Sequence, residues 1–254
     1  MMNVSLQGKQ ILVTREKKQA KEFADLILEH QGIPIEVPLL TVSCKDHKEN
    51  QEVLQSISNY DWIFFTSANG VKCFFETVEK YLTPENALPT NIAVVGHKTE
   101  NALKRFGYSA KFRPSVYNAE VMGMEFLTEF PNPGSILLVR GNLSRDVLPT
   151  TFIDNGLNFD SIEVYETSYN FLVKEQLNKH LEKSQIDFIT FTSPSTVESF
   201  CAMAAKKTGF VYVCIGTTTE NKAREIGLSP IISPSEFTIE EMVRSISKYI
   251  SMKG

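Results

Sequence analysis

The sequence is poor in the residues and motifs that metal-dependent and nucleotide-dependent enzymes use. It has four histidines and four cysteines in 254 residues, and the cysteines show neither C-x-x-C spacing nor a zinc-like spacing to a histidine. A glycine-rich phosphate loop of the Walker or dinucleotide type is absent, as is a G-x-S-x-G nucleophile elbow. We therefore expect a protein that uses neither a metal ion nor an organic cofactor.

Long apolar runs and an excess of positive charge are also missing. The net charge of −4 argues against general binding to nucleic acid or to a membrane surface. No segment reads as a membrane-spanning helix or as an export signal, so we expect a cytoplasmic protein with neither nucleic-acid nor membrane partners. In a reducing compartment we expect free thiols at Cys44, Cys73, Cys201 and Cys214.

What the sequence does contain is a duplication. Residues 61–67 (DWIFFTS) return as residues 187–193 (DFITFTS), with five of seven positions identical. The segment GHKTENALKRFG that begins at Gly96 returns as GTTTENKAREIG at Gly216, and ILVTR returns as ILLVR. The offsets of 126, 120 and 125 residues keep the order and far exceed the period of about 20–50 residues of solenoid repeats. Two similar domains are predicted, with a ligand in the cleft between them.

Short apolar runs alternate with helical patterns through both halves. Buried strands are predicted at residues 10–14, 62–66, 92–95, 136–140, 188–192 and 211–215, and extended segments at 35–42 and 161–167. Helices are predicted at about 20–28, 71–81 and 196–206, up to Gly107 and Gly156, and from Thr217 and Thr238. Strands that alternate with helices form parallel sheets covered on both faces, so the predicted fold class is α/β.

Polar residues follow several strands at the turns into helices. Three turns have the S/T-x-x-E form of a capping box, and they begin at Ser195, Thr217 and Thr238. Such turns place hydroxyls and free backbone N–H groups at the carboxyl ends of strands, where open α/β sheets bind ligands and anions. The same residues cap helices in proteins of any function. The residues alone therefore leave open an enzyme or a non-catalytic, two-domain small-molecule binding protein.

Taken together, these segments resemble the uroporphyrinogen-III synthase family over nearly the whole chain. The resemblance rests on the order and spacing of short segments that are unspecific alone: ILVTR, FTSANGV, VVG, LVRG, EVYET, FTSPS, CIGTTT and FTIEEM. It implies two discontinuous α/β domains, residues 1–37 with 168–254 and residues 41–164, joined by a two-stranded linker at about 37–41 and 164–168. The proline-bearing segment 35–40 suits a linker strand rather than a central one, because proline cannot donate to a ladder.

The resemblance also implies a reaction. The family takes hydroxymethylbilane, a linear tetrapyrrole with eight carboxylates, removes water, inverts ring D and closes the macrocycle to uroporphyrinogen III without a metal or cofactor. Without the enzyme, the linear tetrapyrrole closes spontaneously to the uninverted isomer. The chain is thus expected to be a cyclising lyase of tetrapyrrole biosynthesis (heme, siroheme or cobalamin). We also expect a monomer that contacts the upstream deaminase transiently.

The resemblance also implies roles for individual residues, at the positions where this sequence matches the motifs of the family. Tyr165 matches a family tyrosine that points into the cleft, and a phenol stays protonated at neutral pH and can donate to a departing hydroxyl. The alternative is a strand tyrosine that only packs. Substrate-binding roles carry over to Ser67, Asn69, Gly141, Ser193, Ser195, Thr217, Thr218 and Thr219. Arg15 and Arg140 end equivalent strands and either bind substrate carboxylates or form ordinary surface ion pairs.

Overall fold

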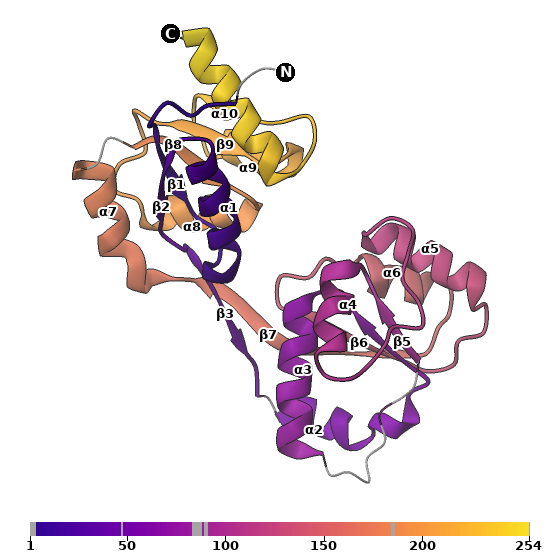
Figure 1. The fold of residues 1–254 in the computed structure, drawn as a ribbon. Helices are drawn as coiled ribbons and strands as arrows, with labels where there is room; N and C mark the ends of the chain where they lie inside the picture. The colour runs from indigo at the N-terminus through magenta and orange to yellow at the C-terminus, as the bar shows by residue number, and fades with distance from the viewer. Residues whose placement is uncertain (1–3, 47, 83–87, 89–90, 184–185, 254) are drawn as a thin grey trace. The chain divides into compact units, whose positions relative to one another are not determined.

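The computed structural model describes residues 4–46, 48–82, 88, 91–183 and 186–253. The chain divides into two compact units (Figure 1): unit 1 comprises residues 1–41 and 168–254, and unit 2 comprises residues 42–167. It passes from unit 1 to unit 2 in β3 (Leu40–Cys44) and returns in β7 (Phe159–Tyr169).

Unit 1 is built on a parallel five-stranded sheet with the order β10-β9-β8-β1-β2. The strands are β1 (Gln10–Val13), β2 (Ile33–Glu36), β8 (Ile186–Phe191), β9 (Val211–Cys214) and β10 (Ile231–Ile232). The helices are α1 (Lys17–Glu29), α7 (Lys174–Lys183), α8 (Pro194–Met203), α9 (Thr217–Glu225) and α10 (Ile239–Lys253), and a 3-10 turn, η2 (Phe171–Val173), precedes α7.

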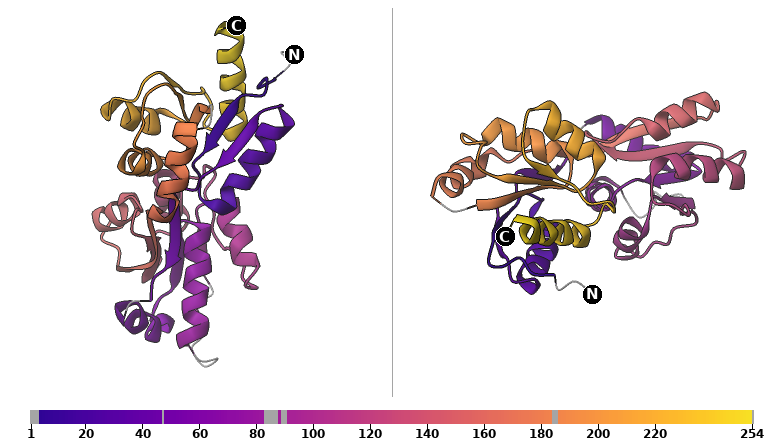
Figure 2. Two further views of the ribbon diagram at one scale, coloured as in Figure 1. Left: turned by 90° about the vertical axis from the view of Figure 1, so that its left-hand side faces the viewer. Right: turned by 90° about the horizontal axis from the view of Figure 1, so that it is seen from above.

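Helices cover both faces of this sheet, as the view from above in Figure 2 shows. On one face, Phe23 of α1 and Val243 of α10 pack with Ile11 of β1 in one buried cluster. On the other face, Phe200 of α8 packs with Tyr212 of β9. The inner strands β1, β8 and β9 therefore bury side chains on two sides, which is why they read as continuous apolar runs rather than as alternating ones.

Unit 2 has the sheet order β3-β7-β6-β4-β5, and its strand pairs β4·β5, β4·β6 and β6·β7 are parallel. The remaining strands are β4 (Trp62–Phe65), β5 (Asn91–Val94) and β6 (Ile136–Gly141). The helices are α2 (Lys48–Gln55), α3 (Ala68–Tyr81), α4 (His97–Lys104), α5 (Ala119–Glu129) and α6 (Val147–Asp154), and η1 (Ile57–Asn59) is a 3-10 turn.

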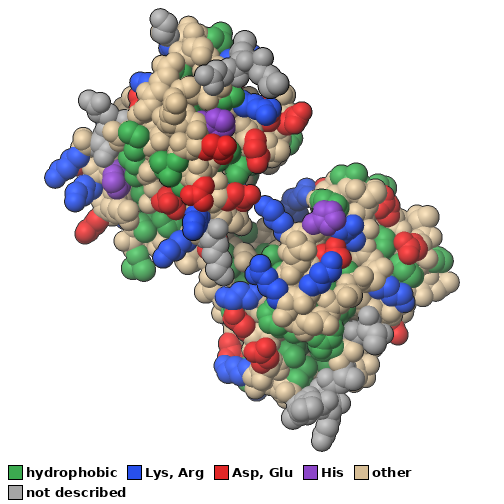
Figure 3. Space-filling view, in the orientation of Figure 1, with side chains coloured by type: hydrophobic (Ala, Val, Ile, Leu, Met, Phe, Trp, Pro, Cys, Tyr) green, Lys and Arg blue, Asp and Glu red, His purple; other side chains and the backbone are tan. Residues whose placement is uncertain are grey.

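Two buried clusters flank the sheet of unit 2. One joins the sheet to α2, α3 and α4 and contains Phe65, Phe74 and Phe75. The other joins it to α5 and α6, and there Phe126 contacts the ring of Trp62 edge-on at a centroid distance of 4.9 Å. Such aromatic contacts add to the stability that burial gives. On the face shown in Figure 3, acidic and basic side chains are interspersed over both units.

The two sheets confirm the duplication. Read from one edge, β9-β8-β1 of unit 1 corresponds to β5-β4-β6 of unit 2, in agreement with the repeated segments. The correspondence extends further than the sequence analysis went. An isolated parallel bridge from Ala93 to Phe112 occupies the position of the β9·β10 pair. Helix α5 then matches α10, because the pairs Tyr117–Asn118 and Phe237–Thr238 precede them in the same way.

Three expectations about local structure need correction. The single extended segment at 35–42 is two strands: residues 35–36, expected in a linker strand, end β2, which is the edge strand of unit 1 and also contains Pro34. An edge position tolerates proline because one side of the strand needs no ladder donor. Helices α2, α5 and α7 were not predicted.

The cysteines also differ from expectation. Cys44 and Cys73 form a disulfide with a Cα–Cα distance of 5.2 Å, so the prediction of four free thiols was wrong for this pair. Cys201 and Cys214 are free thiols. Burial raises the pKa of the Cys214 thiol to about 12, which keeps it protonated and unreactive at neutral pH. Among the described residues, no helix is both long and apolar enough to cross a membrane.

We predict that Phe126→Ala destabilises unit 2 by about 3–5 kcal/mol, because it leaves a cavity beside Trp62. Trp62 is the chain's single tryptophan, so its fluorescence during urea unfolding reports this unit alone. The matched control is Met124→Ala on the same helix, whose side chain is 62% exposed; its effect should stay within about 0.5 kcal/mol. Equal shifts for the two variants would contradict the packing described here.

Candidate functional site

A pocket of about 370 Å³ opens in unit 2 at the carboxyl ends of β4, β5 and β6. Ser67 follows β4, Val95 follows β5, Arg140 is the penultimate residue of β6, and Tyr165 of β7 forms one wall. The loop between β6 and α6 and the start of α5 form the rest of the lining. This is the edge at which open parallel sheets bind ligands.

Tyr165 and Ser67 form a hydrogen-bonded pair in this pocket. Ser67 is the N-cap of α3 and accepts a hydrogen bond from the backbone N–H of Gly70 at 2.9 Å. Its hydroxyl donates to the phenol oxygen of Tyr165 at 3.1 Å. Because the phenol oxygen accepts from Ser67, its own proton is left for a group in the pocket. The structure thus brings two of the predicted site residues together.

Gly141 lies directly under the ring of Tyr165. It is the residue paired with Tyr165 between β6 and β7, just after a shift of strand register. A Cβ atom at this position would lie 2.3 Å from Cζ of Tyr165, a distance that no side chain can occupy. Glycine is required here by the close approach of the ring, and Gly141 therefore sets where the phenol lies.

The loop after β6 is tied to β7 on the far side of Tyr165. The side-chain amide of Asn142 donates to the carbonyl of Thr167 at 3.1 Å and accepts from its backbone N–H at 2.8 Å. The backbone N–H of Asn142 donates to the carbonyl of Tyr165 at 3.3 Å. These three bonds fix the backbone of β7 at Tyr165 and two residues beyond it, a role that was not predicted for Asn142.

Two arginines give the pocket positive charge. Arg140, whose side chain is 14% exposed, donates from Nη2 to the carbonyl of Ser144 at 2.7 Å and to Asp146 at 2.8 Å. Its Nε is buried without a hydrogen-bond partner. Since a guanidinium carries five N–H donors, Arg140 keeps donors for a further carboxylate. Arg145 is more exposed and pairs with Glu120 at 2.8 Å.

The start of α5 supplies pocket residues that the sequence analysis missed, since it did not predict this helix. Tyr117 and Asn118 line the pocket together with Ser144 and Arg145. Asn118 caps α5 by accepting from the N–H of Val121 at 2.8 Å. A backbone N–H of the same turn, aided by Arg145, lowers the pKa of Glu120. Donors at this helix end are therefore already engaged.

The first turns of α4 and α9 differ from that of α5. Their N-caps, Gly96 and Gly216, make no side-chain capping bond, which leaves N–H groups open to an anion. An aromatic ring covers each glycine: a Cβ would lie 2.9 Å from the ring of Tyr117 at Gly96 and 2.8 Å from that of Phe237 at Gly216. Both glycines are extended rather than left-handed, so the neighbouring ring requires them.

The predicted residues of unit 1 follow β1, β8 and β9. Thr217, Thr218 and Thr219 form the first turn of α9, and Thr219 is only 3% exposed, so it can offer a backbone N–H but little of its hydroxyl. The capping box expected at Thr217 is wrong, because Gly216 is the N-cap. Glu220 instead pairs with Arg224 at 2.6 Å.

The capping box expected at Ser195 is also wrong. Helix α8 begins two residues earlier than predicted, at Pro194, with Ser193 as its N-cap and Thr196 closing the box. Ser195 lies in the first turn, and its hydroxyl is 2.9 Å from that of Ser193. At α10 only half of the predicted box forms: Thr238 accepts from the N–H of Glu241 at 3.2 Å, while the Glu241 side chain turns to Arg244.

Arg15 and Asn69 are two further predicted binding residues that do not line the unit 2 pocket. Arg15 follows β1 in unit 1, and its Nη2 donates to Gln19 at 2.8 Å while its Nε is buried without a partner. Burial lowers the pKa of its guanidinium, and Glu22 and Glu240 oppose this shift. Asn69 is half-buried in the first turn of α3, next to the Ser67 cap.

An α/β unit that occurs twice defines a class of two-domain α/β protein, and the hydroxyls, open helix N-termini and arginines at the carboxyl ends of its strands are groups that suit an anionic ligand. Within that class, the chain belongs to the uroporphyrinogen-III synthase family: the family model described as uroporphyrinogen-III synthase HemD matches residues 21–244.

Individual relatives agree with this assignment. The chain is 30% identical over 244 residues to a putative uroporphyrinogen-III synthase of Methanocaldococcus jannaschii, covering 93% of this chain and 97% of that one. It is 27% identical to the porphyrin biosynthesis protein HemD of Ruminiclostridium josui, covering 95% of this chain but only 49% of that longer protein. The crystal structure of uroporphyrinogen-III synthetase from Helicobacter pylori has the same fold, with a TM-score of 0.67 at 16% identity over 96% of this chain and 98% of that one.

We predict that Gly141→Ala destabilises unit 2 by about 1–3 kcal/mol, as overpacking does, because the new methyl group collides with the Tyr165 ring. The measurement is urea unfolding followed by Trp62 fluorescence. In a Tyr165→Ala background the ring is gone, so the same Gly141→Ala change should cost much less. If the two costs are equal, the close approach is not what requires glycine.

Proposed function

We propose that this protein catalyses the uroporphyrinogen-III synthase reaction, in which hydroxymethylbilane loses water, ring D is inverted and the macrocycle closes to uroporphyrinogen III. The family match over residues 21–244 supports the reaction class. The observation that carries the chemistry is the Ser67–Tyr165 hydrogen bond of 3.1 Å at the pocket. It leaves a phenol proton available beside bound substrate. The alternative of a non-catalytic binding protein is not favoured by these matches.

In the proposed mechanism, Tyr165 acts as the general acid. The phenol proton moves to the departing hydroxyl as the carbon–oxygen bond breaks, and water leaves. The resulting cation is attacked by ring D, ring D is inverted before the macrocycle is complete, and the proton lost on closure returns to the phenolate. Ser67 stabilises the phenolate in the meantime, because its hydroxyl already donates to that oxygen.

Carboxylate binding is divided between charged and neutral donors. In unit 2, Arg140 retains unused N–H donors at the pocket, and Arg145 stands at its rim. The open first turns of α4 and α9 add backbone N–H groups without a side-chain cap. We propose that Thr217, Thr218 and Thr219 bind substrate carboxylates chiefly through this turn. Many such donors together suit a substrate with eight carboxylates.

The decisive experiment supplies hydroxymethylbilane from its upstream deaminase to the purified protein and separates the product isomers by chromatography. We expect the type III isomer without added metal or cofactor. The reaction without this protein gives the background of type I, because the linear tetrapyrrole closes spontaneously to that isomer. Type I alone at a high protein concentration would exclude the proposed activity.

We predict that Tyr165→Phe lowers turnover by roughly ten- to a thousand-fold, the scale of a positioned proton donor. The fold should persist because the ring and its contact with Gly141 remain. Tyr169→Phe is the matched control: it removes a phenol from the same strand, one that contacts Glu198 at 3.5 Å and does not line the pocket. Near wild-type turnover of Tyr165→Phe would show that backbone donors and substrate shape suffice.

A further inference from the structure

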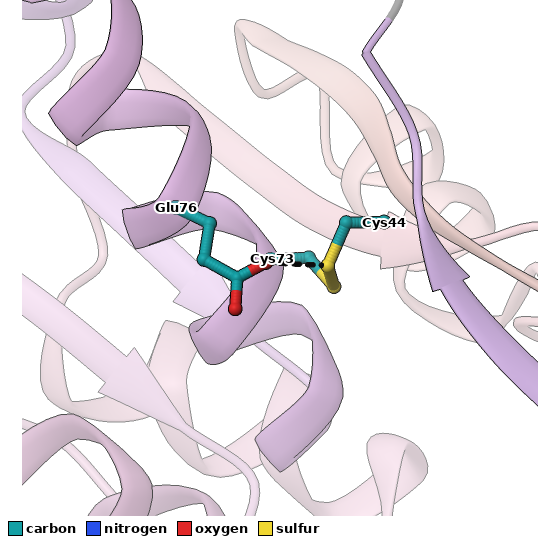
Figure 4. Close-up of side chains that lie close together, drawn as sticks. All are labelled: Cys44, Cys73 and Glu76. Atoms are coloured by element: carbon teal, nitrogen blue, oxygen red, sulfur yellow. Dashed lines mark hydrogen bonds between the residues drawn. A yellow bond between two sulfur atoms is a disulfide. The ribbon is translucent and has the colours of Figure 1, made fainter.

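Two cysteines and a glutamate of unit 2 lie together outside the pocket (Figure 4). Cys44 ends β3, while Cys73 and Glu76 belong to α3. Their ligand atoms, two sulfurs and one carboxylate oxygen, all lie within 4.8 Å of one another. None of the three residues lines the pocket that contains Tyr165, so the cluster has no part in the mechanism proposed above.

The helix geometry explains why these atoms converge. Cys73 and Glu76 are three residues apart, so they lie on one face of α3, one turn from each other. Cys44 approaches that face from β3, and its sulfur lies 3.0 Å from Oε2 of Glu76, the contact drawn dashed in Figure 4. The other oxygen, Oε1, is held by Lys72 at 3.1 Å. One carboxylate oxygen thus faces the cysteines while the other keeps its partner.

One of the three residues is buried and the other two are exposed to solvent. Cys73 is 2% exposed and packs in the apolar cluster beside Phe74. Cys44 and Glu76 are exposed, so an ion or a reductant can approach from solvent. An enclosed thiolate under two accessible ligands is a favourable arrangement for a cation that binds sulfur.

The donor set selects the cation. Thiolates favour soft or borderline ions such as Zn²⁺, and a carboxylate oxygen can serve as the third ligand of a tetrahedral site whose fourth position holds water. Zinc–sulfur bonds of about 2.3 Å require two separate thiolates, so the disulfide and a bound ion exclude each other. Reduction by an external dithiol adds two electrons and two protons to the sulfurs, and metal binding then releases both protons.

We propose that Cys44, Cys73 and Glu76 bind one Zn²⁺ ion in the reduced protein, and that the Cys44–Cys73 disulfide is the oxidised, metal-free form of the same site. The site joins β3, where the chain passes between the two units, to helix α3. Its oxidation state therefore decides whether a covalent bond or a metal ion fixes the end of β3.

The test uses the full chain, reduced without oxygen and titrated with Co²⁺, whose charge-transfer absorption reports thiolate ligands, followed by displacement with Zn²⁺. We expect one Co²⁺ per chain in the wild type and in Cys201→Ser, and loss of the band in Cys44→Ser. Glu76→Gln should weaken binding at least about tenfold, or 1.4 kcal/mol. Glu79→Gln, which removes the same charge from an exposed position of the same helix, should leave the affinity unchanged.

Thiol labelling provides the second measurement. The oxidised protein should expose only Cys201 and Cys214 to label after unfolding, should bind no Co²⁺, and should regain binding on reduction. Absence of Co²⁺ binding by the reduced wild type would overturn the proposal. So would retention of the band in Cys44→Ser, or equal affinities of Glu76→Gln and Glu79→Gln. Because none of these readouts involves turnover, the result is independent of the synthase activity.

Discussion

The close approach of the Tyr165 ring to Gly141 is the constraint on which the site of unit 2 depends. The ring occupies the space in which any residue other than glycine at position 141 would place its side chain. The register shift after Arg140 and the loop that Asn142 ties to β7 adjoin this contact on either side. The same loop carries Ser144 and Asp146, which hold Arg140 at the pocket. A steric fit between two strands thus positions the acid and one of the cations.

Most strands could be predicted from sequence because they are buried on two faces and read as apolar runs, and the duplication located each one twice. Helix α5 was missed although its equivalent, α10, was predicted. Its residues are apolar around much of its circumference, with Met122, Gly123 and Phe126 buried, so its amphipathic pattern is weak. Comparison of Tyr117–Asn118 with Phe237–Thr238 would have revealed it. The predicted cap of α8 was wrong because Pro194 occupies the first helical position, which makes Ser193 the N-cap.

Residues of the candidate site could be predicted only where they belong to a recognisable sequence motif. Ser67, Arg140, Gly141 and Tyr165 come together as their motifs suggested, whereas Tyr117, Asn118 and Arg145 belong to segments whose proximity depends on tertiary packing. The disulfide could not be foreseen, because its cysteines are 29 residues apart and meet only when β3 runs beside α3. Spacing in sequence identifies metal or disulfide pairs only when local structure sets the distance.

The discontinuity of unit 1 has a consequence for biosynthesis. Its interior strand β1 pairs with the central strand β8, whose partner residues lie about 176 positions later, as in Gln10 and Ile186. On the ribosome, β1, α1 and β2 emerge first but cannot complete a sheet until the whole of unit 2 has been translated. Unit 2 is continuous, so it can fold as soon as it emerges. The N-terminal apolar surface of Phe23 and Ile27 therefore stays exposed while the middle of the chain is synthesised. Exposed apolar surface of this kind is what chaperones bind.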